Sequence, residues 1–243
     1  MHKYFHSLQI MTSHIKYIYV AFMLLAMPFF AMRCVAQNVN PCFYVETEDG
    51  EEEATTYSGS APVKVRFEAR PEDLDGYNVN YEWRFFEEGE TEAYVIRYEE
   101  NTEFTFTTSG QHKIVLHAFY DEDSETIELS NEEQPLTITV SESQLEFPNA
   151  FSPNGDGIND TFRAKQGAKS IVEFHAVIVN RWGQVVFKFR DINDEWDGTY
   201  NGKPVKDGVY FLDVNAKGAD GRTFRIRKDV NVLRGYTEKE INS

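Results

Sequence analysis

Apolar and polar residues alternate with a period of two through most of the first half of the chain. Because successive residues of a strand point to opposite faces of a sheet, this pattern predicts half-buried β-strands. Turn dipeptides at Asp75-Gly76, Glu88-Gly89 and Ser109-Gly110 separate the alternating segments, and no helical stripe of ten or more residues occurs. The alternating segments are 63–68, 81–85, 104–106, 113–118 and 136–140. Short, evenly spaced strands in about one hundred residues predict a β-sandwich.

The second half of the chain continues with strands and tight turns. Residues 174–179 are largely apolar on both alternating sets, which predicts a fully buried strand with His175 packed in a core. A hairpin turn is expected at residues 180–183, further turns at 196–198 and 201–203, and a strand at 209–214. The sequence therefore predicts an all-β protein with a second small domain after residue 144.

The first thirty-six residues differ from the rest. Lys3 and Lys16 precede an apolar run, no acidic residue occurs before residue 46, and Cys34 and Ala36 place small residues before a cleavage site between Ala36 and Gln37. This arrangement predicts a secretory signal peptide over residues 1–36. The apolar run is shorter than the roughly 20 residues of a spanning helix, although an uncleaved anchor remains the alternative interpretation. We expect no transmembrane segment in the mature chain.

Charge divides the mature chain. Residues 37–144 hold 26 acidic and 6 basic residues, a net charge of −20, whereas residues 145–243 hold 14 acidic and 15 basic residues, a net charge of +1. Such a change favours two separately folded units joined by the polar bridge 141–144. The acidic half repels nucleic acid, so we expect no nucleic-acid partner. The densest run, residues 48–53, predicts a mobile loop because adjacent like charges repel.

Candidate chemistry is sparse. Cleavage after Ala36 leaves Cys42 as a single cysteine, which excludes a disulfide within the mature chain. Catalytic motifs such as a Gly-x-Ser-x-Gly elbow or a paired-histidine zinc site are missing from the sequence, and a small hydrolase is the least favoured class. We therefore predict a protein that is not an enzyme.

The order of features in residues 37–144 resembles the polycystic-kidney-disease (PKD) type of immunoglobulin-like domain. That family has a central Tyr-x-Trp-x-Phe strand followed by a glycine turn and another strand. Residues 81–85 and 109–116 stand in those places. The resemblance implies an immunoglobulin-like sandwich, in which Trp83 is the core anchor between two sheets.

Residues 145–235 carry four ordered motifs. The stretch 148–162 reads Pro-Asn-Ala-Phe-Ser-Pro-Asn-Gly-Asp-Gly-Ile-Asn-Asp-Thr-Phe, residues 180–183 read Asn-Arg-Trp-Gly, residues 196–203 read Trp-Asp-Gly-Thr-Tyr-Asn-Gly-Lys, and residues 207–210 read Asp-Gly-Val-Tyr. This series resembles the gliding-motility-associated C-terminal domain, the type B signal of the Bacteroidota type IX secretion system. Residues 228–234 lack the family's closing glycine, and a tail at 236–243 extends beyond its usual end.

The resemblance implies a second sandwich at 145–235, so the fold prediction becomes two tandem immunoglobulin-like β-sandwiches after a cleaved signal peptide. It also implies recognition by the type IX outer-membrane translocon and its shuttle and attachment proteins. The residues expected to carry that recognition are Asn180, Arg181, Trp182, Gly183, Trp196, Asp197, Gly198 and Arg234.

Oxygen donors in the glycine-rich loop at Asn154, Asp156 and Asp160 suggest a calcium loop. Lys165 stands where a bidentate glutamate would complete such a loop, and a hydrogen-bonded turn is the alternative. We otherwise expect no cofactor.

The sequence as a whole predicts an exported protein of the periplasm, outer membrane or cell surface, whose C-terminal domain is a secretion and attachment signal. A small component or signalling partner of the secretion machinery is the expected role. A surface adhesion module that binds a protein or glycan through its acidic domain is the alternative.

Overall fold

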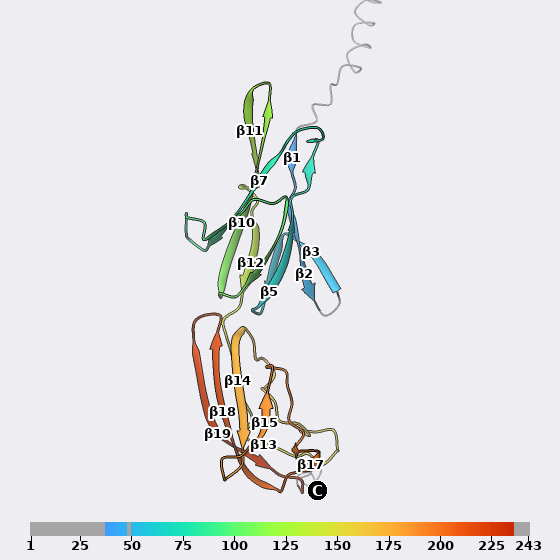
Figure 1. Ribbon diagram of the computed structural model, residues 1–243, viewed down its shortest axis with the longest axis vertical. Helices are drawn as coiled ribbons and strands as arrows, with labels where there is room; N and C mark the ends of the chain where they lie inside the picture. Colours follow the sequence, from blue (N-terminus) through green and yellow to red (C-terminus); the bar gives the residue numbers. More distant parts are fainter. Residues whose placement is uncertain (1–36, 48–49, 236–243) are drawn as a thin grey trace, which may run out of the picture. The chain divides into compact units, whose positions relative to one another are not determined.

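The computed structural model describes residues 37–47 and 50–235, and every regular element in these residues is a β-strand (Figure 1). The all-β prediction is therefore confirmed. The predicted signal peptide at 1–36, including Ala36, and the predicted tail at 236–243 lie outside the described residues.

The first sandwich consists of two main sheets. The larger sheet has the strand order β4 (Thr56–Gly59), β12 (Leu136–Val140), β10 (Gly110–Glu122), β7 (Asn80–Glu87) and β8 (Val95–Arg97). A sixth strand, β11 (Glu125–Ser130), also pairs with β10. The smaller sheet has the order β3 (Gly50–Ala54), β2 (Cys42–Thr47), β5 (Val63–Glu68) and β9 (Asn101–Phe106). A separate pair is formed by β1 (Asn38–Val39) and β6 (Pro71–Glu72).

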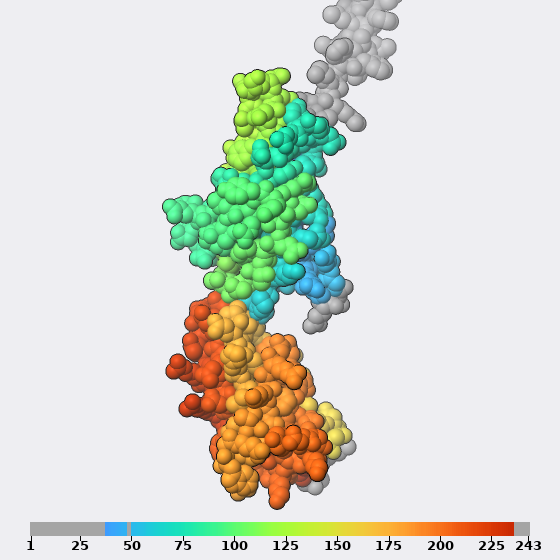
Figure 2. Space-filling model, in the orientation of Figure 1, coloured from blue at the N-terminus to red at the C-terminus, as the bar shows by residue number. Residues whose placement is uncertain are grey.

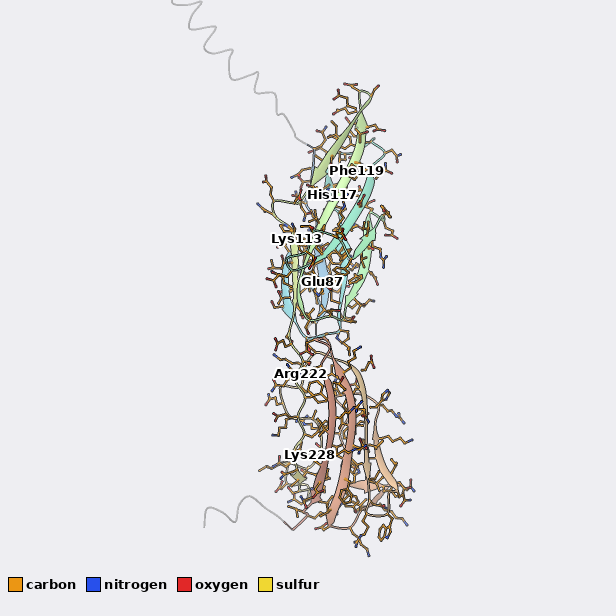
Figure 3. All side chains as sticks on the ribbon, turned by 90° about the vertical axis from the view of Figure 1, so that its left-hand side faces the viewer. Glu87, Lys113, His117, Phe119, Arg222 and Lys228 are labelled. Atoms are coloured by element: carbon orange, nitrogen blue, oxygen red, sulfur yellow. The ribbon has the colours of Figure 1, made fainter. Side chains whose placement is uncertain are left out.

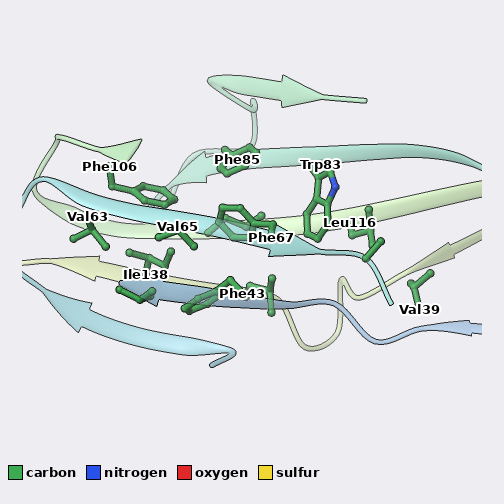
Figure 4. Close-up of a cluster of buried hydrophobic side chains, with 14 of the residues drawn as sticks. Val39, Phe43, Val63, Val65, Phe67, Trp83, Phe85, Phe106, Leu116 and Ile138 are labelled. Atoms are coloured by element: carbon green, nitrogen blue, oxygen red, sulfur yellow. The ribbon is translucent and has the colours of Figure 1, made fainter. Parts of the chain in front are cut away.

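Aromatic side chains from both sheets fill the space between them (Figure 4). Trp83 of β7 is fully buried, and its ring centroid lies 5.5 Å from that of Phe67 on β5. Phe67 also contacts Phe43 and Phe85 at centroid distances of 5.8 and 5.4 Å. Trp83 is thus the core anchor expected from the sequence, because a large ring bridges the gap between two sheets.

The acidic run is not a loop where the structure describes it. Residues 50–54 form strand β3, which pairs with β2. Arg66 donates to Glu51 at 3.0 Å, and Arg70 donates to Glu53 at 2.7 Å. The prediction of a loop was wrong because it considered only the repulsion between adjacent acidic residues. It left out Arg66 and Arg70, which lie elsewhere in the same chain and neutralise the charge of two of these glutamates.

The C-terminal domain is built on one five-stranded sheet. Its strands are β13 (Ala150–Phe151), β19 (Thr223–Val232), β18 (Gly208–Gly218), β14 (Ile171–Val179) and β15 (Val185–Phe189), in that order. Loops cover the inner face, together with a hairpin of β16 (Thr199–Tyr200) and β17 (Lys203–Pro204) and a bridge between Phe162 and Trp196. The core beneath the sheet contains Trp196, Phe162 and Ile178, all fully buried.

Strand β14 has one buried face, not two. Ala176 and Ile178 are buried, but Val177 and Val179 are only half-buried and His175 is exposed. The predicted core position of His175 is therefore wrong. The reason is the layering: loops cover the inner face of this sheet, and the face that carries His175 stays open, which an apolar pattern along one strand does not reveal.

The polar bridge at 141–144 is hydrogen-bonded along its length. The Ser141 hydroxyl lies 2.8 Å from that of Ser170, and Ser143 donates to the Asp220 carboxylate at 2.6 Å. Ser143 and an Arg222 backbone N–H hold the pKa of Asp220 down at about 2. Ala219, in the turn after β18, packs with the hydrophobic cluster that contains Phe67 and Trp83.

Candidate recognition surface of the C-terminal domain

The four sequence motifs of the C-terminal domain lie around one end of its sheet. Val179 at the end of β14 pairs with Phe211 near the start of β18, and Gly208 pairs with Val232 at the end of β19. Phe151 of β13 also pairs with Val232. We call this end the signature end, and it is opposite the end that carries the turn 219–222.

Asp160 organises the loop that contains the first motif. One carboxylate oxygen accepts the backbone N–H groups of Asn154 and Gly155 at 3.0 and 2.7 Å, and the other accepts that of Gly157 at 2.8 Å. These bonds lower the pKa of Asp160, and the bond from Gly155 contributes most. Gly155 and Gly157 have φ angles of 82° and 85°, which few other residues adopt.

The predicted calcium ligands are occupied within this loop. Besides the bonds to Asp160, the side-chain oxygen of Asn154 accepts the N–H of Asp156, whose own carboxylate accepts the N–H of Ile158 at 2.9 Å. In residues 37–47 and 50–235 no group of three or more His, Cys, Asp or Glu side chains could hold a metal ion. N–H groups pointing at the carboxylate fit an internal turn better than a cation. Calcium binding stays a hypothesis.

Asn180 shapes the hairpin turn between β14 and β15. Its side-chain oxygen accepts the backbone N–H groups of Trp182 and Gln184 at 3.0 and 3.1 Å. The N–H of Gly183, whose φ is 79°, donates to the Asn180 carbonyl at 2.9 Å. The turn is therefore fixed by its own bonds, and this conformation needs neither Arg181 nor Trp182 as side chains.

Trp182 projects from this turn with 78% of its surface exposed. The Arg181 guanidinium lies 4.9 Å from the centre of the Trp182 ring, within the range of a cation–π contact. Four other large apolar residues are exposed at the signature end: Ile158, Val209, Phe211 and Leu233. Exposed apolar groups gathered at one place mark interaction surfaces more often than scattered ones do.

Sequence reasoning missed Val209, Phe211 and Leu233 as parts of this surface. A signal for them was present, because residues 209–212 are apolar on both alternating sets while only Tyr210 and Leu212 point into the core.

Trp196 and Gly198 have structural roles within their turn, and their predicted role in recognition is untested. Trp196 is fully buried, and its indole N–H donates to the Thr199 carbonyl at 2.8 Å. Gly198 has a φ of 74°, and a Cβ there would lie 2.9 Å from Pro153 and 3.1 Å from Arg234. Asp197 is exposed, and its carboxylate accepts the N–H and hydroxyl of Thr199.

Arg234 ties the end of the described chain to the motifs. Its guanidinium donates to the Gly198 carbonyl at 2.9 Å and to the Asp207 carboxylate at 2.8 Å, and it also bonds the Val205 carbonyl. Its side chain is 25% exposed. These bonds explain why an arginine stands at this position without the need for a binding partner. The predicted role of Arg234 in recognition is untested.

In the residues that the structure describes, no helix is long and apolar enough to cross a membrane.

Residues 145–226 match the family of CHU_C type IX secretion signal domains. None of the curated proteins is similar to the chain. Among solved structures, the crystal structure of dimeric latent PorU from Porphyromonas gingivalis aligns with 81% of this chain at 16% identity and a TM-score of 0.23. The aligned part spans 20% of the PorU chain.

Proposed function

We propose that this protein, whose residues 145–226 form a CHU_C type IX secretion signal domain, is an exported, non-enzymatic partner of the secretion machinery at the outer membrane. Its C-terminal domain is the signal, and the outer-membrane translocon with its shuttle and attachment proteins is the partner. The family match carries this proposal.

The geometry of the signature end supports recognition of the folded domain. A rigid turn presents Trp182 and Arg181 outward, at the same end of the sheet as exposed Val209 and Phe211. Tryptophan and arginine are the side chains that contribute most to protein interfaces when a partner's pocket desolvates them. The buried motif residues, such as Trp196, shape the turns and do not touch the partner.

The sandwich at residues 37–144 precedes the signal domain, and its core is filled by the aromatic cluster around Phe67. We infer that this domain is itself a binding module of the secretion or signalling apparatus, not a delivered enzyme.

A surface adhesion role is the second candidate. The net charge of −20 in residues 37–144 favours it, because an acidic domain outside the cell attracts a basic ligand.

Deletion of residues 145–243 tests the proposal in a cell with type IX secretion. The truncated protein should accumulate in the periplasm, whereas the full-length protein should be accessible to protease on intact cells. Circular dichroism of the purified truncated protein should show that the first sandwich keeps its fold. Normal surface appearance of the truncated form would refute the proposal. Pull-down from outer membranes separates the two candidates, since the first predicts translocon components and the second predicts extracellular ligands.

A further inference from the structure

Strand β8 is an edge strand with an open side. The larger sheet of the first sandwich ends at β8, which pairs with β7 through Phe85 opposite Val95 and Trp83 opposite Arg97. In residues 37–47 and 50–235 no other strand pairs with it. The segment that contains it, residues 87–100, is called the acidic edge segment. It projects from the sandwich on the left of Figures 1 and 2.

The acidic edge segment is anchored to the sandwich at both ends. It leaves β7 at Glu87, which is labelled in Figure 3. On its return, the Trp83 indole N–H donates to the carbonyls of Glu99 and Glu100 at 3.0 and 3.2 Å. In the middle, the Tyr94 hydroxyl lies 3.0 Å from a ring nitrogen of the buried His112. An anchored strand loses little conformational freedom when a further strand pairs with it.

Apolar side chains are exposed on the open strand and directly after it. Ile96 is 38% exposed and Tyr98 is 69% exposed. An exposed edge with apolar residues is a template for pairing with another strand, and proteins usually blunt it with charge.

The charge here has one sign. The acidic edge segment contains six glutamates and one basic residue, Arg97, which gives a net charge of −5. Among the described residues, none of these six glutamates forms an ion pair, whereas Glu51 and Glu53 of β3 are paired with arginines. The six are Glu87, Glu88, Glu90, Glu92, Glu99 and Glu100.

We propose that β8 binds a basic, extended segment of another protein, which adds to the larger sheet as its next strand. Backbone hydrogen bonds along the open side supply affinity in this mode, and side chains supply specificity. The glutamates select lysine and arginine in the partner, and Ile96 and Tyr98 cover its apolar residues. The same glutamates repel nucleic acid and anionic lipid, so the partner is a protein.

The test uses the full mature protein and a synthetic peptide of alternating lysine and valine. Calorimetric titration should give a saturable complex. The same peptide with a methyl group on every backbone nitrogen keeps its charge but has no N–H group for the strand ladder on either edge, and it should bind at least about tenfold more weakly. Amide exchange of β8 should slow when the unmodified peptide is bound.

Matched charge reversals separate this site from the general charge of the domain. Glu88→Lys with Glu90→Lys should weaken binding at least about tenfold. Glu132→Lys with Glu133→Lys makes the same charge change in the exposed turn after β11 and should weaken binding much less.

Equal effects of the two pairs, equal binding of the methylated peptide, or a lack of saturable binding would each overturn the proposal. The proposal does not depend on the function of the C-terminal domain, so a secretion defect or its absence does not bear on it.

Discussion

Replacement of Gly198 by alanine should destabilise the C-terminal domain through two separate effects. The φ of 74° lies in the left-handed region, where a side chain costs about 1–2 kcal/mol. The added Cβ would also lie 2.9 Å from Pro153 and 3.1 Å from Arg234, and overpacking of this kind costs about 1–3 kcal/mol more. We therefore expect the free energy of unfolding to fall by about 2–5 kcal/mol.

Gly202→Ala is the matched control. Gly202 has a φ of 72°, but a Cβ there meets nothing within 4 Å, so only the backbone cost of about 1–2 kcal/mol applies. Urea unfolding followed by fluorescence measures both variants, and amide exchange of β18 assigns the transition to the C-terminal domain. Equal losses for the two variants would refute the close packing at Gly198, and no loss for either would refute the left-handed turns.

Three further predictions concern polar groups. Arg234→Ala should lower the free energy of unfolding by about 2 kcal/mol in the same urea assay, because carbonyl and carboxylate acceptors at Gly198 and Asp207 lose their donor; an unchanged midpoint would contradict this. Asp220→Asn should be less stable than the native protein at neutral pH, and the difference in free energy of unfolding should shrink as pH falls below 3.8 toward about 2, because a lowered pKa stabilises only while the carboxylate is charged. A constant difference from neutral pH to about pH 2 would contradict the lowered pKa. Calcium at millimolar concentration should give no binding heat, because N–H groups occupy the Asp160 carboxylate; saturable heat that Asp160→Asn abolishes would instead establish the calcium loop.

The strands of the first sandwich could be predicted because their alternation is local. Val63, Val65 and Phe67 face the core as their spacing required, and so does Trp83. The conformation of residues 50–54 could not be predicted, because the two arginines that neutralise the glutamates come from distant positions in the sequence. The exposure of His175 depends on which face of its sheet is covered, and that is a property of the whole domain.

The candidate surface was only partly predictable for a related reason. The motifs identified the turns, but not which residues in them are buried. Trp182 and Trp196 both lie in turns that contain Asn or Asp together with a glycine. Trp182 is nevertheless 78% exposed, whereas Trp196 is fully buried. The difference arises from Phe151, Phe187 and Tyr210, whose rings surround Trp196 and come from three separate segments.

The distinction between the two tryptophans leads to the most direct test of the account. Trp182→Ala should leave the free energy of unfolding within about 0.5 kcal/mol of the native value, because the side chain packs on little besides Arg181. In a cell with type IX secretion, protease accessibility on intact cells should nevertheless fall sharply, and the folded variant should remain in the periplasm. His175→Ala, an exposed ring on the same sheet, is the control and should reach the surface normally. A folded Trp182→Ala protein that reaches the surface as efficiently as the native protein would contradict recognition at the signature end.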